Sequence, residues 1–324
     1  MVNTMTRNET AAWLSDRDRF CILTHTRPDG DTIGSASALC LGLRQLGKTA
    51  YLLENDGVSP FLRDCMDGLT KPHADAGDTL VSVDVASPGM LPENGRELLG
   101  SIALRIDHHA SATSFTPVEL VDSTASASAD LVYDLMTALG VELTQAMARR
   151  LYIAVSTDTG CFRYANTNAH SYQVAAACAA TGADLYPITQ TLFDTNTLGK
   201  LKLQSWIVEN ARFLRDGSAA ICAIPKELEE TVTKEDLENV PGFLRSIAGV
   251  KICASIRQTP MGSKMSVRAV PGYDAAAICA AFGGGGHKGA AGASLNLPPE
   301  EALQVVARML EEYVDKIQSE QGEA

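Results

Sequence analysis

The sequence predicts an α/β protein with an N-terminal parallel-sheet domain followed by a smaller, mixed α+β C-terminal domain. Short apolar runs alternate with helix-like segments through the first half, and this texture changes near residue 217. The chain has 324 residues, which is more than one small core needs and enough for two domains. Its 45% hydrophobic and 20% charged residues are ordinary globular composition.

The first half predicts strands and helices in alternation. The apolar, strand-like runs lie at 20–25, 49–55, 79–84 and 101–107. The segments with helical periodicity lie at 32–47, 125–139 and 143–157. This alternation is typical of a parallel sheet whose strands are joined by helices.

The second half begins with a helical pattern over 169–214 and then returns to strands. The later strand-like runs lie at 218–225, 251–258 and 264–270, with helices expected at 273–283 and 299–317. We therefore predict an N-terminal domain at 1–190, a helical linker at 191–215 and a C-terminal domain at 216–324. The apolar surface of the helices in 169–214 suggests a homodimer.

The charge of the chain excludes some partners. Its net charge of −12 argues against binding to long duplex DNA, which requires a basic surface. A small anionic substrate remains compatible, because bound divalent cations reverse the local field. The sequence shows no apolar signal segment and no apolar run of about 18 residues, so we expect a cytoplasmic protein without a membrane partner.

The eight cysteines contain no CxxC pair, and most lie in apolar segments. A chain of this length needs no disulfide scaffold. We therefore expect buried free thiols and no zinc ribbon.

Aspartate and histidine residues recur where the predicted strands and one helix end. These residues are His25, Asp29, Asp31, Asp84, Asp107, His108, His109 and Asp158. A single aspartate after a strand is usually a helix cap or a turn residue, and Asp31 could be such a cap. The carboxyl ends of parallel strands share one edge, however, so these side chains should converge. Many carboxylates with a few imidazoles suit Mn²⁺ better than zinc, and their number exceeds the needs of one ion.

The segment GGGGHKGAAGAS at 283–294 is the second unusual feature. Its glycines predict either a mobile loop or tight packing, or a place where backbone N–H groups approach an anion. In the last case His287 and Lys288 would add donors. The segment lacks the GK[ST] ending of a P-loop, so we do not expect a nucleoside triphosphatase.

Three motifs in order resemble those of the DHH phosphoesterase superfamily. THTRPDGDT resembles its opening H-x-x-x-D-x-D motif, and LRIDHHAS carries the D-H-H signature itself. The glycine-rich segment is similar to the GGGH motif of the DHHA1 domain. The resemblance covers nearly the whole chain, and the sequence is thereby identified as a member of the DHH/DHHA1 type.

The resemblance implies a dinuclear site, usually with Mn²⁺; Mg²⁺ or another divalent ion is the alternative. Carried onto this sequence, one ion would be held by His25, Asp29 and Asp84. The other would be held by Asp31, Asp84, His108 and Asp158, with Asp84 bridging the two. Two such ions share a water, lower its pKa and clamp the attacked phosphate.

The resemblance also implies roles for residues beyond the ligands. Asp107 would fix the tautomer of a histidine, and His109 would contact the phosphate or the leaving group. In the second domain Arg268, Gly285, Gly286 and His287 would grip a substrate phosphate. Arginine suits this role because its planar guanidinium group can donate two hydrogen bonds to one phosphate. Arg257 is a weaker candidate.

The implied function is that of the nanoRNase/pAp phosphatases. These enzymes degrade short single-stranded oligonucleotides to mononucleotides and remove the 3′-phosphate of adenosine 3′,5′-bisphosphate (pAp). A cyclic di-AMP phosphodiesterase is the alternative, and an inactive nucleotide-binding protein is a remote one, since no expected ligand is missing. RecJ-type exonucleases need extra domains for which the chain has no room. Family II pyrophosphatases share the first motifs but lack a GGGH motif.

Overall fold

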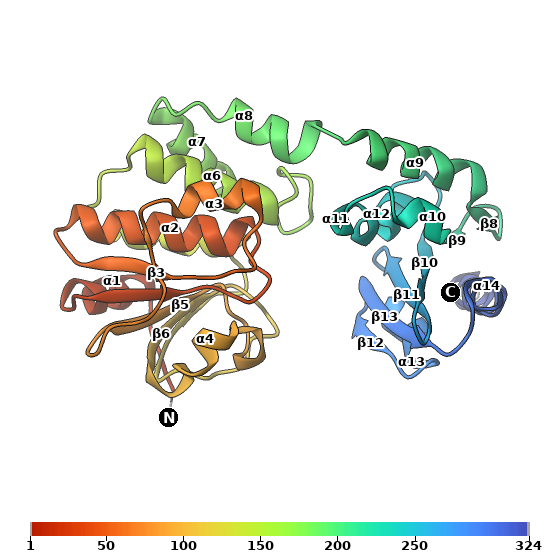
Figure 1. Cartoon of the computed structure of the whole chain (residues 1–324), viewed down its shortest axis with the longest axis horizontal. Coiled ribbons are helices and arrows are strands. Elements are labelled where there is room, and N and C mark those ends of the chain that lie inside the picture. Colours follow the sequence, from red (N-terminus) through yellow and green to blue (C-terminus); the bar gives the residue numbers. More distant parts are fainter. Residues whose placement is uncertain (1, 323–324) are drawn as a thin grey trace. The chain divides into compact units, whose positions relative to one another are not determined.

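The computed structural model describes residues 2–322 and divides into two compact units, Met1–Thr195 and Asn196–Ala324. Figure 1 shows the two units joined by one stretch of chain. Each unit has its own sheet and its own hydrophobic core.

The first unit is built on a seven-stranded sheet in the order β1-β7-β6-β5-β2-β3-β4, and all its strand pairs are parallel. The strands are β1 (Asn3–Thr4), β2 (Phe20–Leu23), β3 (Ala50–Leu53), β4 (Thr70–Lys71), β5 (Thr79–Val83), β6 (Ile102–Asp107) and β7 (Val118–Val121). The predicted parallel sheet is confirmed. Strands β1, β4 and β7 were not predicted, because runs of two to four residues carry little periodicity.

Helices cover both faces of this sheet (Figure 1). The longer ones are α1 (Arg7–Ser15), α2 (Gly30–Gln45), α3 (Pro60–Met66), α5 (Ser128–Ala138), α6 (Gln145–Asp158) and α7 (Ala169–Ala180). The shorter ones are η1 (Pro88–Met90), α4 (Glu93–Arg96), η2 (Leu99–Ser101), α8 (Tyr186–Thr189) and η3 (Gln190–Asp194). Because strand side chains alternate, Phe20 and Ile22 pack on the α2 side, whereas Cys21 and Leu23 pack towards α4.

Two glycines bring α6 unusually close to α2. A Cβ atom at Gly34 would lie 2.3 Å from the carbonyl oxygen of Arg150, and one at Gly30 would lie 2.4 Å from Oγ1 of Thr157. Any larger residue would push the helices apart. This contact places Asp158, the last residue of α6, beside the beginning of α2.

The second unit contains a six-stranded sheet in the order β12-β13-β11-β10-β9-β8. The strands are β8 (Arg212–Leu214), β9 (Ala219–Ala223), β10 (Ile252–Thr259), β11 (Gly262–Ala269), β12 (Gly285–His287) and β13 (Ala290–Leu295). Strands β9 and β10 are parallel and the other pairs are antiparallel, which confirms a mixed α+β fold.

Helices pack on both faces of the second sheet. They are α9 (Leu198–Asn210), α10 (Lys226–Glu229), α11 (Lys234–Glu238), α12 (Val240–Arg245), α13 (Ala275–Ala280) and α14 (Pro299–Gly322). Helices α13 and α14 share one core with the sheet, and α9 and α12 share another with β9 and β10. Leu203 and Ile207 of α9 are buried there, so α9 lies within the second unit. Residues 212–214 form strand β8 rather than the helix predicted over 169–214.

All eight cysteines are free and seven are buried, as predicted. None of the helices described in residues 2–322 is both long and apolar enough to cross a bilayer. Within 169–214 several apolar side chains are exposed, namely Tyr172, Tyr186, Leu198, Leu201 and Val208. The homodimer stays a prediction.

Candidate active site

The segment between β2 and α2 carries three of the predicted ligands. Asp29 is the N-cap of α2: its Oδ1 accepts the backbone N–H groups of Asp31 and Thr32 at 3.0 and 3.1 Å. The cap is therefore Asp29, not Asp31. Its second oxygen, Oδ2, lies 3.6 Å from Nε2 of His25. Burial raises the pKa of Asp29, but bonding to His25 and to the capped backbone outweighs it and leaves that pKa lowered.

Asp31 is buried between two helix N-termini. Its Oδ2 accepts the N–H of Ser128 at 2.7 Å, and its Oδ1 accepts the N–H of Ala129 at 3.1 Å and the hydroxyl of Ser35 at 2.9 Å. The N-terminus of α5 favours a negative charge there. Even so, burial and then the charge of Asp84 raise the pKa of Asp31 well above its ordinary value.

Asp84 occupies the centre of the cluster. It follows β5 with φ of 61°, a left-handed backbone conformation that costs a non-glycine residue about 1–3 kcal/mol. Its Oδ2 lies 3.6 Å from Nε2 of His25, and its Oδ1 lies 3.6 Å from Nε2 of His108. Burial and then the charge of Asp29 raise the pKa of Asp84 to about 6.

His108 joins Asp158 to the same cluster. Its Nε2 lies 3.4 Å from Oδ2 of Asp158 and 3.7 Å from Oδ2 of Asp31. Its Nδ1 lies 3.4 Å from the carbonyl oxygen of Ala125, which orients the ring with Nε2 towards the carboxylates. Burial and then the charge of Asp29 raise the pKa of Asp158, although His108 opposes this.

His109 is held by Asp107. Oδ1 of Asp107 lies 2.8 Å from Nδ1 of His109 and accepts the backbone N–H of His108 at 2.9 Å. This bond raises the pKa of His109 to about 9. Burial raises the pKa of Asp107, but its bonds to His109 outweigh the effect and lower it. The His109 side chain is 35% exposed.

These distances are those expected of metal ligands. Three sets of ligand atoms each lie within 4.8 Å of one another: His25, Asp29 and Asp84; Asp31, His108 and Asp158; and Asp84, His108 and His109. Four of the separations between histidine nitrogens and carboxylate oxygens are 3.6–3.7 Å, which is longer than a hydrogen bond. Atoms that share an ion at about 2.1 Å lie roughly 3 to 3.5 Å apart. All six predicted ligands are thus brought together.

In the second unit, the predicted Arg268 and His287 lie in one row across the sheet. Arg268 on β11 and His287 on β12 both pair with Ala290 on the strand between them, so they share a face. Gly286 has φ of 147°, and a Cβ there would lie 2.6 Å from the carbonyl oxygen of Ala290. The segment is therefore an edge strand rather than a mobile loop. A Cβ atom at Gly285 would meet nothing within 4 Å, so packing does not require glycine there.

Comparisons with known proteins agree with this arrangement. Residues 19–155 match the model of the DHH family, N-terminal domain, and residues 216–316 match the DHHA1 domain. The bifunctional oligoribonuclease and PAP phosphatase NrnA of Thermus thermophilus is 33% identical over 302 residues, which cover 91% of this chain and 90% of that protein. The chain belongs to the DHH family. Its enzyme class is therefore that of a phosphoesterase hydrolase, as the motifs predicted.

Two further relatives fit the same DHH assignment. The protein of the same name from Bacillus subtilis is 24% identical, with 89% of this chain and 93% of that protein covered. The solved structure of an exopolyphosphatase-related protein from Bacteroides fragilis has a TM-score of 0.83 at 24% identity. The superposition covers 96% of this chain and 97% of that structure, so the fold is shared over both domains.

Several residues that contact the candidate metal ligands or Asp107 were not predicted. The hydroxyl of Ser128 donates to Oδ1 of Asp84 at 3.1 Å. Buried Arg105 pairs with Glu119 at 2.8 Å and lies 3.7 Å from Oδ2 of Asp107. A serine near the start of a helix and an arginine in a strand are both common, so the sequence did not indicate that Ser128 and Arg105 contact the site. Only the fold brings them to the site.

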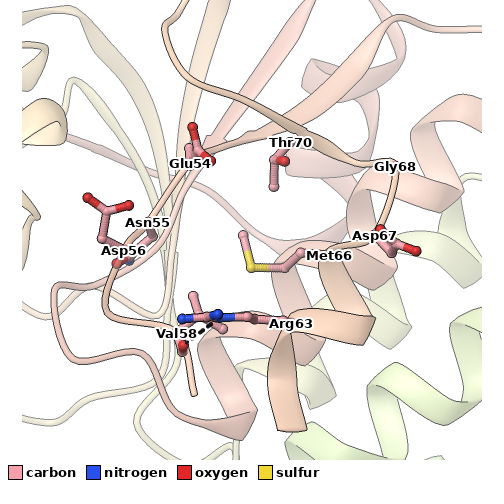
Figure 2. Close-up of a pocket in the computed structure, with 9 residues that line it drawn as sticks. All are labelled: Glu54, Asn55, Asp56, Val58, Arg63, Met66, Asp67, Gly68 and Thr70. Carbon is pink, nitrogen blue, oxygen red and sulfur yellow. Dashed lines mark hydrogen bonds between the residues drawn. The ribbon is translucent and has the colours of Figure 1, made fainter. Parts of the chain in front are cut away.

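A separate cavity of about 380 Å³ lies near the ends of β3 and β4. Figure 2 shows its lining, which is Glu54, Asn55, Asp56, Val58, Arg63, Met66, Asp67, Gly68 and Thr70. The three carboxylates outnumber Arg63, which donates to the carbonyl oxygen of Val58 at 3.2 Å. None of these lining residues is a candidate metal ligand, and the excess of carboxylates disfavours a phosphate.

One residue of this cavity still serves the site. Buried Asn55 donates from Nδ2 to Oγ1 of Thr24 at 3.0 Å and to the carbonyl oxygen of His25 at 2.9 Å. Its Oδ1 accepts the N–H of Gly57 at 3.0 Å. Asn55 therefore fixes the segment that positions the His25 ring.

Proposed function

We propose that the protein binds two divalent cations, Mn²⁺ by preference, and hydrolyses short single-stranded oligonucleotides such as pApA to mononucleotides. It would also convert pAp to AMP. The observation that carries the proposal is the convergence of the other five predicted ligands around Asp84, whose two oxygens face different histidines. The names of the relatives from Thermus thermophilus and Bacillus subtilis support the same substrates.

The ligand sets fit two cations. His25, Asp29 and Asp84 would hold one ion, and Asp31, Asp84, His108 and Asp158 would hold the other. Together the cations would lower the pKa of an attacking water and neutralise charge on the phosphate. Cations would offset the effects that raise the pKa values of Asp31, Asp84 and Asp158, namely burial and the charges of neighbouring carboxylates.

The chain's own residues supply the remaining steps. His109 carries a proton on the nitrogen bonded to Asp107, and its raised pKa keeps it cationic at neutral pH. A cationic, partly exposed imidazole can bind a phosphate oxygen or donate a proton to the leaving oxygen. Arg268 and His287 would hold a second phosphate or a terminal nucleotide, which would position short substrates.

The test is release of AMP from pApA by the purified protein with Mn²⁺, against an EDTA control. Rapid release that EDTA abolishes is the expected result. The same assay with pAp and cyclic di-AMP ranks these substrates, and faster turnover of cyclic di-AMP would replace the proposal by the alternative. Absence of release from all three would overturn the substrate assignment.

A further inference from the structure

The segment 125–129, which leads into helix α5, contacts three of the candidate metal ligands. The carbonyl oxygen of its first residue, Ala125, lies 3.4 Å from Nδ1 of His108. Two of its backbone N–H groups donate to Asp31 at 2.7 and 3.1 Å, and a serine hydroxyl donates to Asp84 at 3.1 Å. The backbone of this entry segment therefore helps to set the geometry of ligands that follow three different strands.

The carbonyl of Ala125 decides which nitrogen of the His108 ring is free. A carbonyl oxygen only accepts, so Nδ1 must carry the proton when the ring bonds to it. The other nitrogen, Nε2, then keeps its lone pair. It is Nε2 that lies 3.4–3.7 Å from carboxylate oxygens of Asp31, Asp84 and Asp158. An outer acceptor of this kind commonly fixes the tautomer of a metal-binding imidazole.

The entry segment has no side-chain cap of its own. Its N-cap residue, Ala127, makes no side-chain hydrogen bond to the first turn of α5. Ser126, Ala127 and Ser128 are fully buried, so water cannot satisfy their backbone groups. Asp31 accepts two of the N–H groups, and the remaining bonds must come from other parts of the unit.

Asp130 supplies the first of these bonds. It is the third residue of α5 and is fully buried. Its Oδ2 accepts both the backbone N–H and the hydroxyl of Ser126, each at 2.8 Å. The carboxylate of a capping box reaches back from the same position to the residues before the helix. Oδ1 of Asp130 has no hydrogen-bond partner among residues 2–322, so one oxygen makes both contacts.

Asn166 bonds the entry segment from the loop that follows α6. Its Nδ2 donates to the carbonyl oxygen of Ser126 at 2.9 Å and to that of Asp158 at 3.1 Å. The hydroxyl of Ser171 donates to the Ser126 hydroxyl at 2.8 Å. The N–H, hydroxyl and carbonyl groups of Ser126 are thus all bonded, and Asn166 ties this residue to the end of α6 that carries Asp158.

We propose that Asp130 and Asn166 are positioning residues for the ion site that contains His108. By bonding the entry segment, they keep the Ala125 carbonyl against the His108 ring and the N–H groups of α5 against Asp31. Asp130 acts through the oxygen that accepts both bonds, and its negative charge is not required. This inference rests on the two-cation site of the proposed function.

The first experiment replaces Asp130 by leucine and by asparagine. Asp130→Leu removes the acceptor, whereas the amide oxygen of Asp130→Asn can accept the same two bonds and its NH₂ group replaces the unpartnered Oδ1. In titration calorimetry with Mn²⁺, we expect the Kd of one binding event to rise about 10- to 100-fold in Asp130→Leu and less than about threefold in Asp130→Asn. Equal weakening in both variants would show that the charge matters, and would overturn the role.

The matched control is Asp134→Leu, which removes a carboxylate one turn farther along α5. Asp134 pairs with Arg7 at 2.7 Å and with His170 at 3.1 Å. Its Mn²⁺ affinity should stay at the wild-type value, and a loss equal to that of Asp130→Leu would mean that any loosening of α5 has this effect. Asn166→Ala alters an exposed side chain and decides the matter if Asp130→Leu does not fold. We expect it to weaken one Mn²⁺ by about three- to tenfold, and an unchanged affinity would overturn the proposal.

The tautomer of His108 separates this inference from the proposed function. Nitrogen-15 NMR of the metal-free protein at alkaline pH, with the signal assigned through His108→Gln, needs neither metal nor turnover. We expect the proton on Nδ1 in the wild type and in Asp130→Asn, and a mixture of tautomers in Asp130→Leu. A wild-type ring protonated on Nε2 would overturn the inference even if pApA were hydrolysed. A proton on Nδ1 without any hydrolysis would support it and overturn only the substrate assignment.

Discussion

The two units use opposite electrostatics on different kinds of surface. The first unit buries Asp31 and Asp84 together, against the preference of carboxylates for water. The second unit displays Lys264 and His287 as exposed side chains on β11 and β12. A buried acidic cluster repels a phosphate until cations bind, whereas an exposed basic face attracts one but contains no carboxylate cluster to bind catalytic ions. The proposed function thus places catalysis in the first unit and substrate binding in the second.

The sharpest way to test this division is to remove the centre of the acidic cluster. Asp84→Ala takes a ligand from both proposed ions, so we expect kcat for pApA to fall at least about 10³-fold. Titration calorimetry with Mn²⁺ should show loss of one or both binding events. Asp134→Ala is the control, since Asp134 lies in the same unit but pairs with Arg7. Retained turnover in Asp84→Ala would refute the dinuclear assignment.

The corresponding change in the second unit should affect binding rather than chemistry. For Arg268→Ala we expect KM for pApA to rise about tenfold, with a much smaller change in kcat, because a charged hydrogen bond to phosphate is worth roughly 1.5–3 kcal/mol. Arg308→Ala, which alters an exposed arginine of α14, is the matched control. A fall in kcat with an unaltered KM would show that the contrast between the units is wrong.

A third prediction concerns the link between Asp107 and His109. In Asp107→Asn the histidine loses the bond that raises its pKa to about 9, so the pKa should return towards 6.5. Proton NMR titration of the metal-free protein measures this, with His170 as the internal control. We also expect kcat to fall about 10- to 100-fold. An unchanged titration of His109 would show that Asp107 does not control its protonation.

Much of this contrast could be predicted from the sequence. Strand-end positions predicted that His25, Asp29, Asp31, Asp84 and His108 converge, because the carboxyl ends of parallel strands share an edge whatever the details of packing. Asp158 lies at the end of a helix, and the resemblance to the family assigned all six residues as ligands. Arg268 and His287 were assigned by resemblance to the family. Their shared row through Ala290 depends on the strand register, which no sequence pattern displayed.

What the sequence did not show depends on contacts between distant segments. Asp29 rather than Asp31 caps α2, because only the fold brings the N–H groups of Ser128 and Ala129 to Asp31. The left-handed backbone of Asp84 is likewise imposed by its position at the end of β5. From the sequence alone, the glycine segment could have been a mobile loop, a tightly packed segment or a place of anion contact. At Gly286 a Cβ atom would clash with the backbone of Ala290, so tight packing explains the glycine at that residue.

The smallest predicted effect is on stability, and it tests whether the acidic cluster is strained without cations. Burial raises the pKa values of Asp84, to about 6, and of Asp31, so the folded state holds these protons more tightly than the unfolded state. His109 acts in the same direction, since its stabilising charge is lost as pH rises through about 9.

The Tm of the EDTA-treated protein should therefore fall by a few degrees between about pH 5 and pH 9, through Asp84 in the acidic part of this range and through His109 in the alkaline part. Mn²⁺ should raise the Tm most at the alkaline end, because ionised carboxylates are the ligands. Asp84→Asn should flatten the metal-free slope below about pH 7, since an amide does not titrate. Thermal melts followed by circular dichroism supply all three values. A metal-free Tm that rose with pH would mean that the buried carboxylates are already compensated within the protein, and the case for cations in the first unit would lose its physical basis.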